Sequence, residues 1–133
     1  KQFGTRIWRV APKVYDYMTK IEPTRRALDQ LGVQAWVTGR RRSQGGVRET
    51  LPLLEIDESD GRLKMNPLIN WPLDDVWQHI RSNNLPYNAL QDQGYSSVGD
   101  MVTTEKPVEG EGERGGRWKG SSKSECGMHV AQD

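Results

Sequence analysis

Residues 23–38 read PTRRALDQLGVQAWVT, and this stretch decides the fold class. Pro23 suits the first turn of a helix, and the apolar residues that follow it continue a helical pattern that Gly32 ends. The apolar, β-branched run over 33–38 predicts a buried strand. A helix followed directly by a strand indicates an α/β domain, in which ligands gather beyond the carboxyl ends of the strands.

A loop rich in arginine and glycine, GRRRSQGGVR, occupies residues 39–48 directly after this strand. A guanidinium group can donate two hydrogen bonds to the oxygens of one phosphate or sulfate, and glycines let backbone amides approach an anion. The loop therefore predicts a polyanion site. The alternative is a solvated basic loop or a localisation-type basic run. The position at the end of a strand favours the ligand site.

The rest of the chain alternates short elements with loops. Segments 51–56 and 63–65 flank a turn and predict a hairpin. Apolar residues at helical spacing predict a helix over 73–80. We interpret His79, within that helix, as a structural or surface residue. Residues 1–19 carry scattered aromatics, and we expect irregular connections there.

The only cysteine of the chain, Cys126, follows a long stretch of glycines and mixed charges. Residues 105–124 offer too little apolar surface to order by themselves, which predicts a flexible tail. The basic residues around Cys126 favour the thiolate, which is the nucleophilic form of the side chain. We therefore predict an α/β part over 1–104 and a mobile tail over 105–133 with a reactive cysteine. The alternative is an incidental surface thiol.

Composition limits the classes of function. The 133 residues fit one domain, and the net charge of +1 provides no global field to attract nucleic acid. A single cysteine excludes an internal disulfide and a multi-cysteine metal site, and it favours a reducing, cytoplasmic location. No apolar run approaches the roughly 20 residues that span a bilayer, so we expect no membrane association. The hydrophobic fraction of 34% is low for a self-sufficient globule.

Four segments, taken together and in order, resemble the phosphoadenylyl-sulfate (PAPS) reductase family, the thioredoxin-dependent enzymes of sulfate assimilation. They are Lys20-Ile-Glu-Pro23, Thr38-Gly-Arg-Arg-Arg-Ser-Gln44, Gly94-Tyr-Ser-Ser-Val-Gly-Asp100 and Glu125-Cys-Gly-Met-His129. The resemblance covers the chain from about Tyr15 to His129. The family usually has leucine where Met128 stands.

The resemblance implies an adenine-nucleotide α-hydrolase-like fold, a mainly parallel α/β sheet with flanking helices and a flexible C-terminal tail. The phosphate-binding loop of the family, Ser/Gly-rich and followed by Lys-Asp, has no counterpart here. We therefore expect this chain to be the C-terminal part of a longer protein. Relatives are commonly homodimers, so a homodimer is one expected assembly.

The resemblance also implies a reaction. The thiolate of Cys126 attacks the sulfuryl sulfur of PAPS, which releases adenosine 3′,5′-bisphosphate and leaves an S-sulfocysteine. A thiol of thioredoxin then attacks the sulfur of Cys126 and releases sulfite. Thioredoxin is thus the expected electron donor and partner, and no bound cofactor is expected.

The family's functional residues carry over to nine positions. The expected catalytic residues are Cys126, His129 and Tyr95, where His129 contacts the sulfuryl group or favours the thiolate. The expected substrate-binding residues are Lys20, Arg114 and Arg117 near the sulfuryl group, and Arg41, Arg42 and Gln44 at the nucleotide phosphates. Arg40 stands where relatives often have an apolar residue, and we assign it no role.

The sister family, adenylyl-sulfate (APS) reductases, usually holds a four-iron cluster on four cysteines. The matching positions here are Tyr15, Asp16, Asp100 and Thr103, so we expect no iron–sulfur cluster and favour PAPS as substrate. Three alternatives stay open: a cluster-free APS reductase, a sulfate adenylyltransferase small subunit, and a non-catalytic, truncated nucleotide-binding relative. The adenylyltransferase would not need the terminal Glu-Cys-Gly-Met-His motif.

Overall fold

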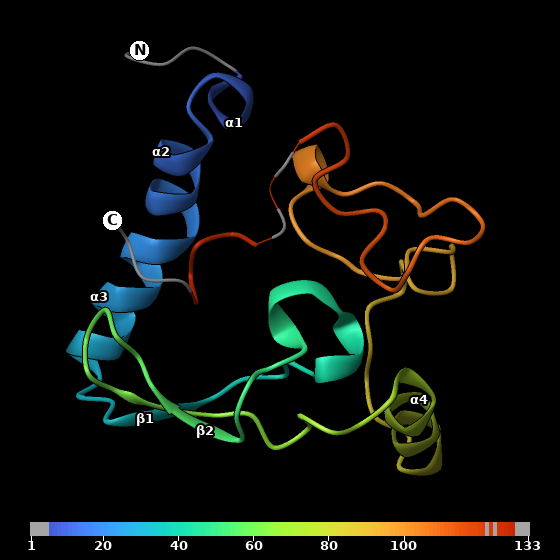
Figure 1. The fold of residues 1–133 in the computed structure, drawn as a ribbon, viewed down its shortest axis with the longest axis horizontal. Helices are drawn as coiled ribbons and strands as arrows, with labels where there is room; N and C mark the ends of the chain where they lie inside the picture. The colour runs from blue at the N-terminus through green and yellow to red at the C-terminus, as the bar shows by residue number, and fades with distance from the viewer. Residues whose placement is uncertain (1–5, 122, 124, 130–133) are drawn as a thin grey trace. The chain divides into compact units, whose positions relative to one another are not determined.

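The computed structural model describes residues 6–121, 123 and 125–129 (Figure 1). The chain divides into two compact units. Unit 1 contains the described parts of Lys1–Trp36, Leu54–Met65 and Glu125–Asp133. Unit 2 contains Val37–Leu53 and the described part of Asn66–Ser124.

Unit 1 begins with two short helices, α1 over Ile7–Val10 and α2 over Pro12–Asp16. A π-helical turn, η1, continues α2 over Tyr17–Ile21. The predicted irregular structure is therefore wrong over 7–19, while residues 1–5 lie outside the described residues. Pro12 occupies the first position of α2, where its missing N–H breaks no helical hydrogen bond, so this proline begins a helix.

The predicted helix after Pro23 is confirmed as α3, over Glu22–Gln30. Pro23 lies in the first turn of α3. Gly32, at φ +61, has the left-handed backbone conformation that glycine adopts most readily. The amide of Val33 then donates to the carbonyl of Leu28 at 2.9 Å, which closes the helix end.

A three-stranded sheet follows, with β1 over Ala35–Val37, β2 over Leu54–Ile56 and β3 over Leu63–Met65. The spatial order is β1-β3-β2. The predicted hairpin is confirmed, because β2 and β3 pair antiparallel with Glu55 opposite Lys64. The strand predicted over 33–38 is present, but its burial is wrong, since Ala35 is exposed and Val37 is 66% exposed. In the described chain β1 lies at an edge of the sheet, and only Trp36 is partly covered.

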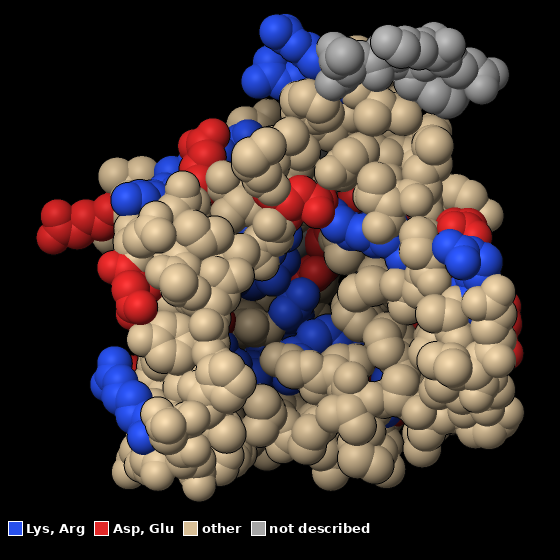
Figure 2. Space-filling model, turned by 180° about the vertical axis from the view of Figure 1, so that it is seen from behind, with Lys and Arg blue, Asp and Glu red and all other residues tan. Residues whose placement is uncertain are grey.

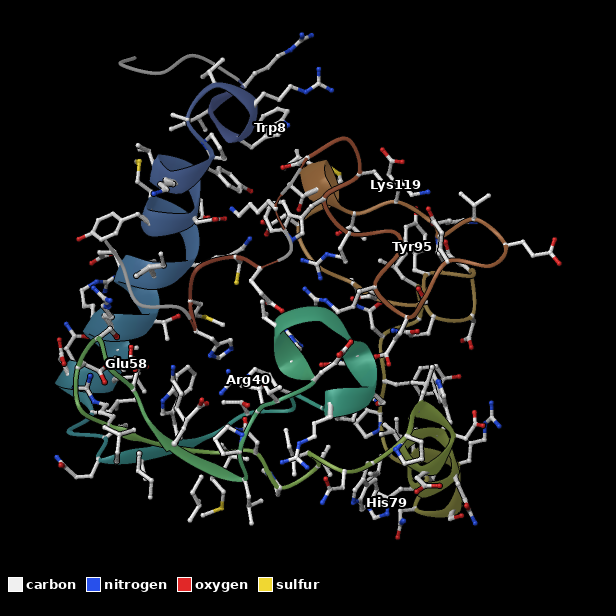
Figure 3. All side chains as sticks on the ribbon, viewed as in Figure 1. Trp8, Arg40, Glu58, His79, Tyr95 and Lys119 are labelled. Atoms are coloured by element: carbon white, nitrogen blue, oxygen red, sulfur yellow. The ribbon has the colours of Figure 1, made fainter. Side chains whose placement is uncertain are left out.

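The described part of unit 2 contains one helix of ordinary length, α4, over Leu73–Ser82, which confirms the helix predicted over 73–80. Asp74 and Asp75 lie in its first turn, where carboxylates interact favourably with the helix dipole. His79 is exposed, and its ring meets the ring of Trp71 edge-on at 5.4 Å (Figure 3). The exposure and the ring contact agree with the prediction that His79 is a structural or surface residue.

Three single turns of 3-10 helix lie in the loops of unit 2: η2 over Arg42–Gln44, η3 over Gly46–Arg48 and η4 over Met101–Thr103. The first two form the basic loop directly after β1. The third leads into a glycine-rich segment over residues 103–118.

The glycine-rich segment of unit 2 folds back on itself. The amide of Glu105 donates to the carbonyl of Gly116 at 2.8 Å, and the amide of Trp118 donates to the carbonyl of Thr103 at 3.0 Å. A Cβ at Gly116 would approach the carbonyl oxygen of Glu105 to 1.9 Å, so this crossing requires glycine. Trp118 is buried, and the ammonium of Lys123 lies 4.2 Å from its ring centroid. The mobility of this segment stays a prediction.

Charged side chains of both signs appear on the face drawn in Figure 2, in keeping with a net charge near zero. Among the described residues, no helix has the length and apolar character to cross a bilayer.

A buried ion pair joins the turn of the hairpin to β3. The Nζ atom of Lys64 lies 2.6 Å from a carboxylate oxygen of Asp57, and both side chains are less than a tenth exposed. Burial by itself raises the pKa of Asp57, but hydrogen bonds from Lys64 and Ser59 outweigh burial and hold this pKa below its usual value.

We expect Asp57→Asn to lower the free energy of unfolding by roughly 3 kcal/mol at pH 7, because it leaves the buried ammonium of Lys64 without its counter-charge. A lowered carboxyl pKa stabilises the folded state above the unfolded-state pKa of about 3.9, and this contribution is lost as pH falls through the folded-state pKa. The difference between wild type and Asp57→Asn should therefore shrink below about pH 4 in denaturant titrations. Glu58→Gln, exposed on the same turn, is the control and should change little. Equal losses for both variants at pH 7 would contradict the role of the pair.

Candidate active site

The Cys126 segment, residues 125–129, contacts two elements of unit 1. The hydroxyl of Thr24, on α3, donates to the sulfur of Met128 at 3.5 Å. The ring of His129 stacks on the ring of Trp36, on β1, with 5.2 Å between centroids and 24° between planes. Cys126 itself is a half-buried free thiol. These contacts give the nucleophile predicted from sequence a defined place in unit 1.

Trp36 is a residue that sequence reasoning did not single out. Besides His129, its ring faces the ammonium of Lys64 at 5.5 Å from the centroid. Lys64 in turn is held by Asp57. Little in the sequence distinguishes Trp36, because an aromatic residue that faces inward from a strand is common in protein cores.

Lys20 lies on the π-helical turn η1 of unit 1. Such turns are rare and occur often at functional sites. The Nζ atom of Lys20 lies 3.6 Å from a carboxylate oxygen of Asp16, whose side chain is 4% exposed. Lys20 therefore shares unit 1 with Cys126 and His129, and it has a carboxylate partner. Asp16 could have been identified from the sequence as the partner of Lys20, because a carboxylate four residues before a lysine on a helix is a usable signal.

A network of buried polar side chains lies where the basic loop of unit 2 begins. The hydroxyl of Thr38 donates to Asn66, and the Nε atom of Arg40 donates to that hydroxyl at 3.1 Å. The amide of Asn66 donates to the carbonyl of Pro52 at 2.9 Å. All three side chains belong to buried residues, and Asn66 is fully buried. Arg40, to which we assigned no role, thus helps to fix the path of the chain just after β1 (Figure 3).

Arg41 and Gln44 converge on one carboxylate. Arg41 is 4% exposed and donates to the hydroxyl of Ser43 at 2.9 Å and, at 3.4 Å, to the carbonyl of Trp71. Its other terminal nitrogen donates to Oε1 of Glu113. The side-chain amide of Gln44 donates to the same oxygen at 3.2 Å. Glu113 could not be identified from the sequence, because an acidic residue in a segment of mixed charges carries no distinguishing signal.

Arg42 has different partners from Arg41. Its Nε atom donates to the carbonyl of Leu51 at 2.9 Å, and a terminal nitrogen donates to Asn70 at 3.0 Å. These bonds tie η2 to the chain on either side of the hairpin. Arg42 is exposed, in contrast to the buried Arg41.

The structure brings Arg117 against the loop 94–100, which contains Tyr95. A terminal nitrogen of Arg117 donates to the carbonyl of Val98 at 3.1 Å and to the hydroxyl of Ser97 at 3.5 Å. A Cβ on Gly99 would lie 2.2 Å from the guanidinium, so the absence of a side chain at this position makes the room that Arg117 fills. Tyr95 is half-buried, with the ammonium of Lys106 5.5 Å from its ring centroid (Figure 3).

The predicted site residues thus form two groups, one in each unit. Unit 1 holds a thiol, an imidazole and an ammonium group, which is the composition of a nucleophile with electrostatic support. Unit 2 holds the arginines, an amide and a tyrosine, which is the composition of an oxyanion-binding site. The residues of the first group are Lys20, Cys126 and His129, and those of the second are Arg41, Arg42, Gln44, Tyr95, Arg114 and Arg117. Arg114 is half-buried, and its carbonyl accepts from the amide of Arg117 at 2.9 Å. In the part of the chain that the structure describes, no group of three or more His, Cys, Asp or Glu side chains could hold a metal ion.

Comparison with curated proteins reveals close relatives. The chain is 51% identical over 130 residues to phosphoadenosine phosphosulfate reductase of Saccharomyces cerevisiae, covering 98% of the chain and 50% of that protein. It is 40% identical over 130 residues to adenosine 5′-phosphosulfate reductase of Oceanobacillus iheyensis, covering 98% of the chain and 53% of that protein. The chain therefore spans about half the length of the curated relatives it matches.

Solved structures confirm the predicted α/β fold class. The crystal structure of phosphoadenylyl-sulfate reductase from Candida auris, a phosphate complex, is 43% identical and aligns with a TM-score of 0.69, covering 78% of this chain and 49% of that one. The structure of Candida glabrata FMN adenylyltransferase is 21% identical with a TM-score of 0.57, covering 80% and 43%, and it shows a shared fold only.

The family of this chain is shown by a domain model that matches most of the sequence. The sequence model of the phosphoadenosine phosphosulfate reductase domain matches residues 1–106. The resemblance found in the four short motifs is thereby confirmed. This chain belongs to the phosphoadenosine phosphosulfate reductase family.

Proposed function

We propose that this chain carries the nucleophile and part of the substrate site of an enzyme that reduces PAPS to sulfite and adenosine 3′,5′-bisphosphate. The observation that carries the proposal is Cys126, which lies in a Glu-Cys-Gly-Met-His motif in a member of this family. The relatives named phosphoadenosine phosphosulfate reductase, at 51% and 50% identity, support this substrate.

The reaction proceeds in two displacement steps. The Sγ atom of Cys126 forms a bond to the sulfuryl sulfur, and the bond from that sulfur to the phosphate oxygen breaks. Adenosine 3′,5′-bisphosphate leaves with the electron pair, and the enzyme retains an S-sulfocysteine. A thiolate of thioredoxin then attacks Sγ, and sulfite leaves with the electron pair of the S–S bond. Thioredoxin's second thiol resolves the mixed disulfide and restores the Cys126 thiol, so thioredoxin supplies both electrons.

Negative charge on the sulfuryl and phosphate oxygens is the main electrostatic demand of the first step. Lys20, Arg114 and Arg117 interact with the sulfuryl oxygens in this proposal. Three residues of the basic loop bind the nucleotide phosphates, namely Arg41, Arg42 and Gln44. Tyr95 belongs to the same site, and His129 supports the thiolate or contacts the sulfuryl group.

The remaining expectations belong to the same proposal. Residues 1–104 form the C-terminal part of the α/β domain, and residues 105–133 act as the mobile element that delivers Cys126 first to substrate and then to thioredoxin. The enzyme works in the cytoplasm without a bound cofactor, and a homodimer is one expected assembly. The residues at the cluster positions, Tyr15, Asp16, Asp100 and Thr103, support the absence of an iron–sulfur cluster.

A second candidate function is APS reduction by the same chemistry without a cluster. The observation in its favour is the 40% identity to proteins named adenosine 5′-phosphosulfate reductase. The two activities differ in whether the substrate carries a 3′-phosphate, so one experiment separates them.

We expect the full-length, reduced protein to gain a sulfite-sized mass on the peptide that contains Cys126 when it is mixed with PAPS in the absence of thioredoxin. Thioredoxin should remove this mass, because its thiolate attacks Sγ and expels sulfite. Intact-protein and peptide mass spectrometry measure both steps. Cys126→Ser is the control and should gain no mass while still binding nucleotide. Labelling by APS and not by PAPS would establish the second candidate, and labelling by neither would refute both.

We expect Gly99→Ala to slow S-sulfocysteine formation about tenfold in single-turnover measurements. The added methyl group would displace the guanidinium of Arg117 from its seat against Val98 and Ser97. Arg117→Ala should slow the same step by roughly 100-fold, as for removal of one oxyanion-binding group.

The matched control for this prediction is Gly112→Ala, because a Cβ at Gly112 meets nothing within 4 Å. Gly112→Ala should keep the wild-type rate. If Gly99→Ala also kept that rate, the seating of Arg117 by Gly99 would have no part in the reaction.

A further inference from the structure

The Glu113 carboxylate is held as a bound anion would be held. The buried guanidinium of Arg41 and the side-chain amide of Gln44 both donate to one of its oxygens. Guanidinium and amide donors that meet at one oxygen are the usual means of binding phosphate or sulfate. The two donors come from the basic loop, for which the sequence alone predicts a polyanion ligand.

Several contacts keep Glu113 in this place. Its side chain is only 12% exposed. Its carbonyl accepts from the hydroxyl of Ser96 at 2.7 Å, which ties the residue to the loop that contains Tyr95. Gln44 is itself oriented, since its side-chain oxygen accepts from the amide of Arg41 at 3.2 Å. The donors are thus arranged for an anion, and Glu113 is the anion that they hold.

We propose that Glu113 is an internal occupant of the phosphate site formed by Arg41 and Gln44, and that a phosphate group of the nucleotide binds there by displacing it. The proposal rests on the proposed function only for the identity of the nucleotide. Both the carboxylate and a phosphate oxygen need the same donors, so the two cannot bind them at the same time. Glu113 therefore lowers the affinity of the site for every ligand that needs these donors.

Displacement also links ligand binding to the glycine-rich segment. Glu113 belongs to the segment 103–118, which is closed by the bonds between Thr103 and Trp118 and between Glu105 and Gly116. When a phosphate takes the donors, the side-chain contact between this segment and the basic loop is lost. The coupling is reciprocal. If phosphate binding favours release of the segment by some factor, then release of the segment favours phosphate binding by the same factor.

The test is isothermal titration calorimetry of adenosine 3′,5′-bisphosphate, and separately of inorganic phosphate, with the full-length reduced protein. We expect Glu113→Gln, which keeps the size of the side chain and removes its charge, to bind both ligands roughly 5- to 50-fold more tightly than wild type. Glu113→Asp, which keeps the charge but is shorter by one methylene, should also bind more tightly, by a smaller factor. Glu109→Gln is the matched control, since Glu109 is exposed on the same segment, and its affinity should stay within twofold of wild type.

Unchanged or weaker binding by both Glu113 variants would overturn the proposal and make Glu113 a permanent partner that orients Arg41. Melting curves without ligand show whether each variant is folded, and Glu113→Asp supplies the answer if Glu113→Gln unfolds. The mass-spectrometric test of Cys126 separates this inference from the proposed function. Labelled wild type without tighter binding by the variants refutes only the displacement by phosphate, whereas tighter binding without any labelling refutes only the reductase chemistry.

Discussion

A buried guanidinium requires a counter-charge, and this requirement organises unit 2. Arg41 is 4% exposed, and an unpaired charge at that depth would cost several kcal/mol. Glu113 supplies the charge from 72 residues further along the chain. With Glu113 in place, Gln44 and Ser96 find their partners too, and the basic loop, the Tyr95 loop and the glycine-rich segment are tied together. These contacts join a segment whose composition predicts disorder to two neighbouring loops.

In unit 1 an aromatic ring is the group at which side chains from different segments meet. Trp36 receives the imidazole of His129 as a stacked neighbour and faces the ammonium of Lys64, which Asp57 neutralises. The side chain of Met128 is also held by a contact that suits its chemistry. The family usually has leucine there, whereas a thioether can accept the hydrogen bond from Thr24. The departure from the family motif is therefore accommodated by a contact that leucine could not make.

Elements with a local signal were predictable from the sequence. Pro23 and Gly32 mark the beginning and end of α3, and apolar spacing marks α4. The helices over 7–21 were missed although Ile7, Val14, Met18 and Ile21 recur at helical spacing; the helical path there is interrupted at Ala11 and ends in a π-helical turn. The burial of β1 was wrong because burial depends on which segments cover the strand. Likewise, the candidate residues were predictable from motifs, but the carboxylate partner of Arg41 was not, since its pairing with Glu113 depends on the fold.

The ion pairs of this chain, whose net charge is +1, bear on how the strongly anionic substrate proposed above would bind. Two of the proposed substrate-binding cations already have internal carboxylate partners, Asp16 beside Lys20 and Glu113 beside Arg41. Binding of a phosphate or sulfuryl group at such a cation is then an exchange of anions and not the capture of an anion by a free charge. Exchange lowers affinity for any weak anion, since the incoming group must compensate for the lost ion pair. It therefore favours ligands with dense negative charge, which is the property that a bisphosphorylated nucleotide has and a simple carboxylate lacks.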